Sequence, residues 1–304
     1  MSSQEIDKLI ELISKDLDIK VESIVSPPQG MDSHVLFIVD EKDMKYVIKI
    51  GDGTESDVNA YKLIEKNELN IPVPKVFLNK RYGKFSVIVM ESIPYPLLES
   101  IPTPEIGKYV PSMIDTLNTM HSVKSQKTGY LNKLDETRTW KEFHLSKFDG
   151  TDDYLKWEKI SKRKGLNSRL ILSSVEKYIK SFSNTYVPLK EYSLIHTDYN
   201  QRNLFVNPDN YQIAGIIDWG ESMFGDPIYD FARVRMLIWH FNLGNEVVDK
   251  YYLLMNYTLE QRRLDDLYWI SRVIEYLAYY SENLNQFNSA RIKLHQEFLR
   301  NLEW

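Results

Sequence analysis

The 304-residue chain contains no cysteine, which excludes disulfides, thiolate nucleophiles, iron–sulfur clusters and cysteine-ligated zinc. It has no apolar run near the roughly 18 residues that a membrane span needs, and its first residues lack the pattern of a signal peptide. It also lacks an excess of positive charge, because 38 basic residues against 43 acidic ones give a net charge of −5. We therefore expect a soluble, cytoplasmic protein that binds neither nucleic acid nor membranes, and no protein partner is implied.

The residues that are present are typical of a globular protein, with 43% apolar and 27% charged residues. At about 150 residues a domain, the length predicts two domains or one two-lobed fold. The sequence shows neither an internal repeat nor a Gly/Ser-rich linker, so we expect the two parts to pack as one unit with a cleft between them.

Hydrophobic periodicity predicts two lobes of different composition. Ser2 and Glu5 have the spacing of a capping box at the start of a helix. Strands are predicted at 34–40, 44–50, 76–78 and 85–90, with a helix at 58–66 between them. Pro94 and Pro96 then interrupt the chain. We place the lobe boundary here, with an N-terminal lobe at 1–96 and a C-terminal lobe at 97–304.

The C-terminal lobe is predicted to be mainly helical. Helices are expected at 104–123, 138–148, 168–184, 227–240, 245–256, 261–283 and 287–302, with short strands near 193–195, 204–206 and 211–217. The fold class is therefore α+β, with a small antiparallel sheet in the first lobe and a larger helical second lobe.

Three oxygen-bearing side chains after apolar runs carry the strongest chemical signal. Asp198, Asn203 and Asp218 have the ligand type that Mg²⁺ prefers. Phosphoryl transfer requires in-line positioning, charge neutralisation by Mg²⁺ and one group that orients the attacking hydroxyl, and these residues would supply that set. Two other interpretations are ordinary turn-forming residues and, with His196, a hydrolase metal site. The other histidines have no ligand spacing, which disfavours the second.

The pattern His196-x-Asp198-x-x-x-x-Asn203, followed by Asp218 in an Ile-Asp-x-Gly motif, resembles the catalytic and metal loops of the aminoglycoside phosphotransferase family, relatives of the protein kinases. The resemblance implies a bilobal, protein-kinase-like fold with ATP or GTP as co-substrate and Mg²⁺. It makes Asp198 the catalytic base, Asn203 and Asp218 the metal ligands, and His196 a structural support. The family more often has glycine where Thr197 stands.

Downstream, Asp226 and Pro227 form a strong helix start by local chemistry alone, with an N-cap followed by proline at the first helical position. The resemblance implies that Asp230, one turn later, bonds the backbone of the catalytic loop. Both aspartates are interpreted as structural supports.

In the first lobe, Lys49 lies in a half-buried strand, where a charge is unusual unless it meets an anion. Taken alone, a solvent-facing lysine is the commoner interpretation. The resemblance implies a lysine that contacts the α- and β-phosphates and pairs with a glutamate of the following helix. Alignment places Asn59 or Ala60 nearer the usual position, but we favour Glu55 as the partner.

Further nucleotide contacts are predicted by position only. Gly30 and Ser33 are expected in the loop that covers the phosphates, although a plain turn is equally compatible with the sequence. Backbone groups of Glu91 and Ile93 occupy the place of the interlobe hinge, where they would bond the adenine edge.

The acceptor pocket is expected in the helical lobe, where polycationic aminoglycosides need carboxylates. Glu221, Glu275 and Trp239 are the candidates, although a solvated helix face explains each glutamate equally well. The segment 217–226, with Thr139-Trp140 and Glu142-Phe143, looks closest to hygromycin B phosphotransferases. We therefore expect an O-phosphotransferase that acts on a small polycationic antibiotic, with hygromycin B favoured, and confers resistance to it.

Other functions remain open. The chain could phosphorylate another small alcohol, such as a macrolide, choline, homoserine or a sugar-like compound. It could also be a non-catalytic nucleotide-binding module, since fold does not dictate function. A protein kinase is disfavoured, because residue 200 is asparagine instead of lysine and no Ala-Pro-Glu sequence ends an activation segment.

Overall fold

The computed structural model describes residues 1–27, 33–51, 53–135, 137–151, 156–282 and 284–304. Its contacts divide the chain into two compact units. Unit 1 comprises Met1–Pro102, Tyr130–Asn132 and Gln201–Ser222, and unit 2 comprises Thr103–Gly129, Lys133–Asn200 and Met223–Trp304. The lobes 1–96 and 97–304 stay a prediction, and the contact-based units differ from them chiefly in the segment 201–222.

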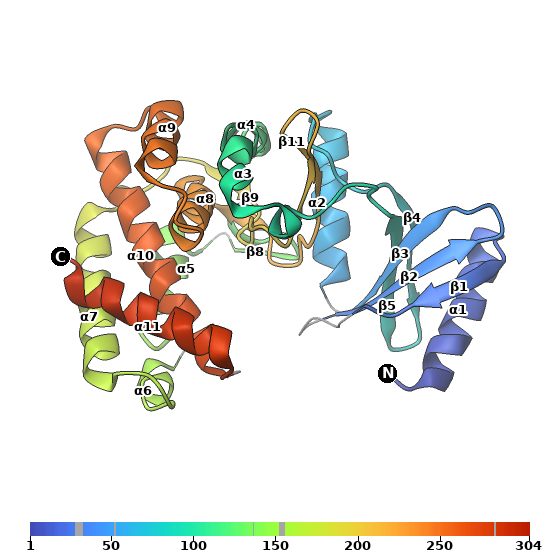
Figure 1. Cartoon of the computed structure of the whole chain (residues 1–304), viewed down its shortest axis with the longest axis horizontal. Coiled ribbons are helices and arrows are strands. Elements are labelled where there is room, and N and C mark those ends of the chain that lie inside the picture. The colour runs from blue at the N-terminus through green and yellow to red at the C-terminus, as the bar shows by residue number, and fades with distance from the viewer. Residues whose placement is uncertain (28–32, 52, 136, 152–155, 283) are drawn as a thin grey trace. The chain divides into compact units, whose positions relative to one another are not determined.

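Unit 1 is built on a five-stranded antiparallel sheet in the order β1-β2-β3-β5-β4 (Figure 1). The strands are β1 Val21–Val25, β2 His34–Asp40, β3 Lys45–Ile50, β4 Val76–Tyr82 and β5 Phe85–Glu91. Helix α2 (Thr54–Lys66) follows β3. Strand β1 was not expected, because four of its five residues are exposed and give no alternating pattern.

Helix α1 (Ser3–Leu17) packs on this sheet through its apolar stripe. Leu9, Ile10 and Ile13 form one buried cluster with side chains of β2, β3 and β5. The Ser2 hydroxyl accepts from the Glu5 N–H at 3.2 Å, and the Glu5 carboxylate accepts from the Ser2 N–H at 2.8 Å. The predicted capping box is therefore present, and it starts the helix where the sequence indicated.

A hairpin from far along the chain completes unit 1. Strands β10 (Leu204–Asn207) and β11 (Gln212–Ile216) pair antiparallel, and the 3₁₀ turn η1 (Leu98–Ser100) lies beside them. The Val206 N–H donates to the Pro96 carbonyl at 2.9 Å, and the Ile216 N–H donates to that of Pro72 at 2.8 Å. A Cβ at Gly215 would lie 2.4 Å from the terminal methyl of Ile93, so any other residue here would require the Ile93 side chain to move.

Unit 2 is mainly helical (Figure 1). Its helices are α3 Thr103–Ile106, η2 Gly107–Tyr109, α4 Val110–Met120, α5 Trp140–Ser146, α6 Trp157–Ile160, α7 Ser168–Thr185, α8 Ile228–His240, α9 Asn245–Met255, α10 Leu259–Glu282 and α11 Gln286–Asn301. Helix α10 contacts α7, α8 and α11. The single helix expected at 104–123 is divided into α3, η2 and α4, with Pro111 in the first turn of α4.

Short strands join the helices of unit 2. They are β6 Lys124–Ser125, β7 Thr128–Tyr130, β8 Lys133–Asp135, β9 Tyr192–Ile195 and β12 Met223–Gly225, in the order β6-β9-β12-β7-β8. The expected α+β class, with an antiparallel sheet first and a mainly helical remainder, is confirmed.

An aromatic core fixes the start of α8. The Trp140 indole donates to the Tyr268 hydroxyl at 2.6 Å, and that hydroxyl donates to Asp226 at 2.9 Å. A Cβ at Gly225 would lie 2.3 Å from the Trp140 ring, so glycine lets β12 pass directly against it. Other rings of this core are His144, Tyr178, Phe182 and Tyr229.

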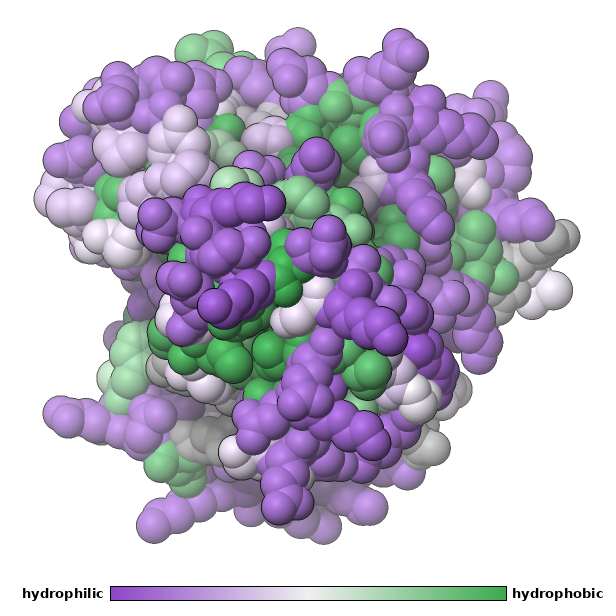
Figure 2. Space-filling view, turned by 90° about the vertical axis from the view of Figure 1, so that its right-hand side faces the viewer, coloured by the Kyte–Doolittle hydropathy of each residue, from purple (hydrophilic) through white to green (hydrophobic). Residues whose placement is uncertain are grey.

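Hydrophilic residues cover much of the surface shown in Figure 2, with hydrophobic ones between them. Within the described residues, no helix is long and apolar enough to cross a membrane.

Candidate active site

In unit 1, a buried lysine lies between two carboxylates. The Lys49 ammonium of β3 is 2.7 Å from Asp57 of α2 and 2.8 Å from Asp218, which follows β11. Burial lowers the pKa of Lys49, but the two carboxylates outweigh this effect and raise the pKa above its usual value. Lys49 is therefore an ammonium ion at neutral pH, and Asp218, whose side chain is about half exposed, is its more accessible partner.

The prediction that Glu55 pairs with Lys49 is wrong, because the helix residue that binds Lys49 is Asp57. The helix was expected from Val58, but α2 begins at Thr54 and includes both acidic residues in its first turn. Two residues turn a helix by about 200°, so Asp57 faces inward while Glu55 is exposed. Asp57 also accepts the backbone N–H of Trp219 at 2.6 Å, which ties α2 to the segment containing Asp218.

The hairpin β10–β11 brings Asn203 and Asp218 to the same end. Asn203 precedes β10 and Asp218 follows β11, and the Ile217 N–H donates to the Asn203 carbonyl at 3.0 Å. Asn203 is buried, and Asp218 has a left-handed backbone with φ of 65°. An amide and a carboxylate oxygen fit the donor chemistry of Mg²⁺. The described residues contain no cluster of three or more histidine, cysteine or acidic side chains suited to a metal.

The other predicted nucleotide contacts lie along the same unit. Ser33 immediately precedes β2, whereas Gly30 lies outside the described residues. Glu91 ends β5, and its N–H already donates to the Lys75 carbonyl at 2.8 Å. Ile93 is half-buried beside β11, and Glu221 is exposed just after the Asp218 segment.

In unit 2, Asp230 of α8 holds the start of the loop that contains Asp198. Its carboxylate accepts the N–H groups of His196 and Thr197, both at 2.8 Å, and lies 3.1 Å from His121 Nε2. Burial raises the pKa of Asp230, but these hydrogen bonds and the neighbouring histidines lower it overall. These are the backbone contacts that the resemblance implies for Asp230.

Two arginines that the sequence analysis did not single out bind the same loop. Arg233 of α8 donates from Nε to the Thr197 carbonyl at 3.1 Å, and one of its terminal nitrogens binds the Asp198 carboxylate. Arg272 of α10 donates to the same carbonyl at 2.8 Å. The available signal was positional, since Arg233 lies three residues after Asp230 and so shares its helix face.

Asp198 is about one-third exposed, and His196 beside it is buried. The Asp198 N–H donates to His196 Nδ1 at 3.3 Å. Burial raises the pKa of Asp198, but the Arg233 guanidinium, together with smaller effects of His196, Asn200 and Arg272, outweighs burial, and the pKa lies below its usual value. At neutral pH the side chain is therefore a carboxylate, the form in which a general base accepts a proton.

The sequence predicted Asp226 as the N-cap of this helix. In the structure α8 begins at Ile228 with Pro227 as its N-cap, so Asp226 lies one residue before the cap. Its carboxylate accepts from the Ile228 N–H at 3.0 Å and from the Tyr268 hydroxyl at 2.9 Å. Because it is buried, its pKa is raised to about 6.

The two substrate candidates of unit 2 already have protein partners. Glu275 lies 3.2 Å from Arg272 and 3.9 Å from Lys147, so two cations compensate its charge. Trp239 is half-buried and packs against Trp269, with ring centroids 5.7 Å apart. It also contacts His295 and Phe298.

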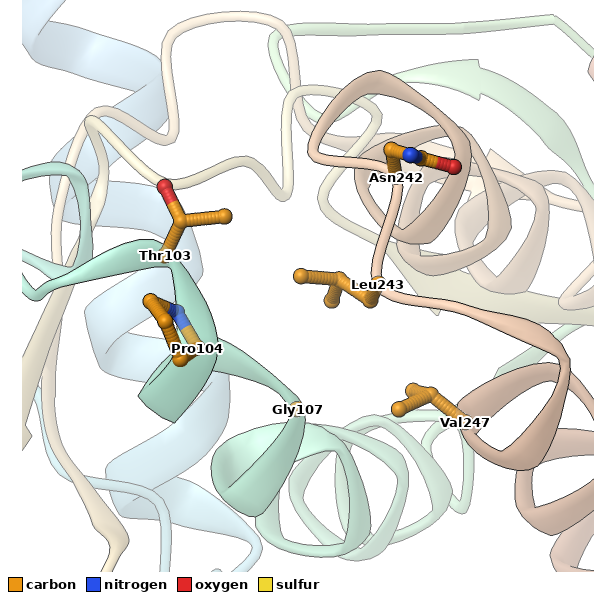
Figure 3. Close-up of a pocket in the computed structure, with 6 residues that line it drawn as sticks. All are labelled: Thr103, Pro104, Gly107, Asn242, Leu243 and Val247. Carbon is orange, nitrogen blue, oxygen red and sulfur yellow. The ribbon is translucent and has the colours of Figure 1, made fainter.

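Unit 2 also contains a cavity of about 190 Å³. Residues of α3 and η2 line one side, and residues around the α8–α9 connection line the other (Figure 3). The lining residues are Thr103, Pro104, Gly107, Asn242, Leu243 and Val247. None of them carries charge, and none belongs to the residues singled out for catalysis.

Comparisons with known proteins place this geometry in a family. The model of the phosphotransferase enzyme family matches residues 23–263. None of the curated proteins matches the chain. Among solved structures, a thermostable variant of aminoglycoside phosphotransferase APH(4)-Ia, in ternary complex with AMP-PNP and hygromycin B, has a TM-score of 0.75 at 14% identity. That match covers 95% of this chain and 96% of the other.

Two further structures have the same fold. Aminoglycoside phosphotransferase APH(2'')-Ib bound to ADP has a TM-score of 0.61 at 16% identity, covering 96% of this chain and 98% of that one. Spectinomycin phosphotransferase APH(9)-Ia, in complex with ADP and spectinomycin, has a TM-score of 0.63 at 19% identity, covering 97% and 93%. The kinase-like fold is thus shared, and the resemblance seen in the sequence is confirmed. The chain belongs to the phosphotransferase enzyme family.

Proposed function

We propose that the protein transfers the γ-phosphoryl group of ATP or GTP to a hydroxyl of an aminoglycoside, with hygromycin B as the first candidate. Family membership supports phosphotransferase activity. Solved structures of the same fold contain AMP-PNP or ADP, and three of them contain hygromycin B. The observation that carries the proposal is the buried Lys49 ammonium with Asp218 half exposed beside it, which offers opposite charges to a metal-bound polyphosphate.

Lys49 would bind the α- and β-phosphates. Asn203 and Asp218 would hold Mg²⁺, which when bound supplies charge neutralisation to the phosphates. Asp198 accepts the proton of the acceptor hydroxyl as the hydroxyl oxygen bonds to the γ-phosphorus. The bond from this phosphorus to the bridging oxygen breaks, and the nucleoside diphosphate leaves. His196 and Asp230 support the loop, and Asp226 supports the start of α8.

The remaining nucleotide contacts would come from unit 1. Backbone groups of Glu91 and Ile93 would bond the adenine edge, and the loop with Gly30 and Ser33 would cover the phosphates. Because the Glu91 N–H is already bonded to Lys75, the adenine contact at this residue would use its carbonyl oxygen.

For the acceptor, Glu221 is the best candidate to bind a cationic group, since it is exposed. Glu275 and Trp239 are weaker candidates, because cations compensate the first and rings surround the second. A less cationic alcohol is therefore the second candidate substrate. It is favoured by the three cations of unit 2 that bind the Asp198 loop and Glu275, namely Arg233, Arg272 and Lys147.

The test is a coupled nucleotide-consumption assay with Mg²⁺ and ATP or GTP, with mass detection of the product. The panel contains hygromycin B, other aminoglycosides, macrolides, choline and homoserine. We expect one added phosphate on an aminoglycoside, and a loss of turnover on the order of 10² to 10⁴ in Asp198→Asn with nucleotide binding retained. Phosphate only on a macrolide or small alcohol would favour the second candidate. Nucleotide consumption without any acceptor product would contradict both.

A further inference from the structure

The Arg233 side chain connects α8 to the side chain of Asp198. It is buried, with 7% of its surface exposed, and all three of its nitrogens donate hydrogen bonds. Nε binds the Thr197 carbonyl, one terminal nitrogen binds the Tyr276 hydroxyl at 2.6 Å, and the other binds the Asp198 carboxylate. The guanidinium therefore contacts both the backbone and the carboxylate of the loop.

The next arginine on this helix has no such role. Arg235 binds Asp265 at 3.1 Å and also pairs with Asp266, and its guanidinium lies 4.2 Å from the centre of the Trp269 ring. All these partners belong to α10. The contact of Arg233 with Asp198 is thus a property of one helix position, and not of arginines on α8 in general.

The electrostatic consequence follows from burial. A carboxyl group that is two-thirds buried tends to become protonated, because burial disfavours its charge. Arg233 opposes this tendency more strongly than the other groups that favour the carboxylate, which are His196, Asn200 and Arg272. It remains charged because arginine does not deprotonate in proteins. Its planar fork also restricts where the carboxylate can point, which a lysine ammonium would do less well.

We infer that Arg233 is a positioning residue for Asp198, which it keeps ionised and oriented to accept the proton of the acceptor hydroxyl. This inference rests on the proposed function of Asp198. Arg233 itself touches neither substrate nor nucleotide in this role, and it acts through the carboxylate that it binds.

The kinetic test compares pH profiles of kcat/KM for wild type, Arg233→Lys, Arg233→Met and the control Arg235→Met. Arg235→Met also removes an arginine from a buried carboxylate, that of Asp265, so its cost in stability should be comparable. Unlike the Arg233 variants, this control does not change the contacts of Asp198. In Arg233→Met we expect kcat/KM at neutral pH to fall on the order of 10-fold to 100-fold. The midpoint of the acidic limb of the kcat/KM profile should move to higher pH by about 1 unit or more. The midpoint for Arg233→Lys should lie between those of Arg233→Met and wild type.

A second measurement does not need an acceptor. In protein labelled with ¹³C-aspartate, the carboxyl signal of Asp198 is identified by its absence from Asp198→Asn. Between about pH 4.5 and pH 7 this signal should stay at its ionised position in wild type and titrate in the Arg233 variants. If Arg233→Met does not fold, Arg233→Lys carries the test.

The inference is overturned if the Asp198 signal titrates alike in wild type and in the Arg233 variants. It is also overturned if Arg235→Met shifts the pH profile of kcat/KM as far as Arg233→Met does. If the wild-type protein phosphorylates no acceptor in the panel, that assay refutes the proposed function without any result from the Arg233 variants. The ¹³C titration then still decides whether Arg233 sets the ionisation of Asp198.

Discussion

The backbone of Thr197 is left-handed, with φ of 66°, which is unusual for a β-branched residue. The surrounding groups impose this conformation. Asp230 accepts its N–H, and Arg233 and Arg272 both donate to its carbonyl. Such restraint from both sides explains how a threonine occupies a position where the related family more often has glycine.

This leads to a prediction about Thr197→Gly. The left-handed conformation costs a β-carbon about 1–2 kcal/mol, which glycine would recover. Glycine loses about 0.5–1 kcal/mol to unfolded-chain entropy and about 0.8 kcal/mol for the buried methyl of Thr197, so the effects nearly cancel. We expect the free energy of unfolding, measured by denaturant titration, to stay within about 1 kcal/mol of wild type. In Thr128→Gly, which removes a buried hydroxyl bonded to the Phe224 carbonyl at 2.7 Å, the loss should be about 2 kcal/mol. Equal losses in the two variants would contradict the strain at Thr197.

A second residue-scale prediction concerns the partner of Lys49. Asp57→Ala leaves a buried ammonium with one carboxylate instead of two and frees the Trp219 N–H, so the free energy of unfolding should fall by at least about 2 kcal/mol. Glu55→Ala is the matched control, because this residue is exposed in the same helix turn. It should stay within about 0.5 kcal/mol of wild type. A larger loss in Glu55→Ala than in Asp57→Ala would refute the pairing.

The sequence predicts the loop residues of the candidate site, but it does not predict their long-range partners. The positions of Asp198, Asn203 and Asp218 follow from a local motif with fixed spacing. The pairing of Lys49 with Asp218 joins residues 169 positions apart, and that of Arg272 with Thr197 joins residues 75 apart. Such contacts depend on how helices and strands pack, which neither periodicity nor spacing encodes.

Among the elements, those with a strong pattern were predicted best. The long amphipathic helices α7 and α11 lie within two residues of their expected bounds. Strands β1, β6, β7, β8 and β12 were missed, because β1 is mostly exposed and the others have only two or three residues. Short pairings like these arise from tertiary contacts and leave little local signal.

A pair of histidines links the end of α8 to α11. The Nε2 atoms of His240 and His295 are 2.9 Å apart, and His295 Nδ1 lies 3.0 Å from the Val273 carbonyl oxygen. That oxygen can only accept, so Nδ1 carries the hydrogen. Burial lowers the pKa of His240 to about 2 and that of His295 to about 4. Both rings are therefore neutral in the folded protein near neutral pH.

The pH dependence of stability follows from this neutral pair. In the unfolded chain a histidine binds a proton below about pH 6.5, whereas these two do not in the folded state. Stability should therefore fall as the pH drops below about 6.5, by up to about 1.4 kcal/mol per pH unit for each histidine. In His240→Gln we expect a shallower fall between about pH 6.5 and pH 4, measured by urea titration at each pH. A slope equal to that of wild type would refute the contribution of His240.

At the scale of the molecule, unit 1 is assembled from separate stretches of chain. The segment 201–222 supplies the hairpin β10–β11, the carboxylate of Asp218 and the N–H of Trp219 that Asp57 accepts. The hairpin also bonds the chain at Pro72 and Pro96. Residues 1–102 are thus continuous in sequence but incomplete in contacts.

This predicts the behaviour of a fragment. A protein consisting of residues 1–102 should melt at a lower temperature, and less cooperatively, than the same residues joined to 201–222 by a flexible Gly/Ser linker. The reason is that only the second protein retains Asp218 beside Lys49, the Trp219 N–H that Asp57 accepts, and Gly215 beside Ile93. Circular dichroism melts of the two proteins test this, and superimposable curves would show that the hairpin contributes nothing to unit 1.

The same interlacing limits how such a chain can be recombined. A single crossover near residue 102, which exchanges the first third of the gene with that of a relative, would transfer the sheet without the hairpin that completes it. The hybrid would pair Lys49 from one parent protein with Asp218 from the other. These two residues would not have evolved together. To exchange unit 1 as a whole, residues 201–222 must be replaced as well as residues 1–102. The two segments therefore have to come from the same parent.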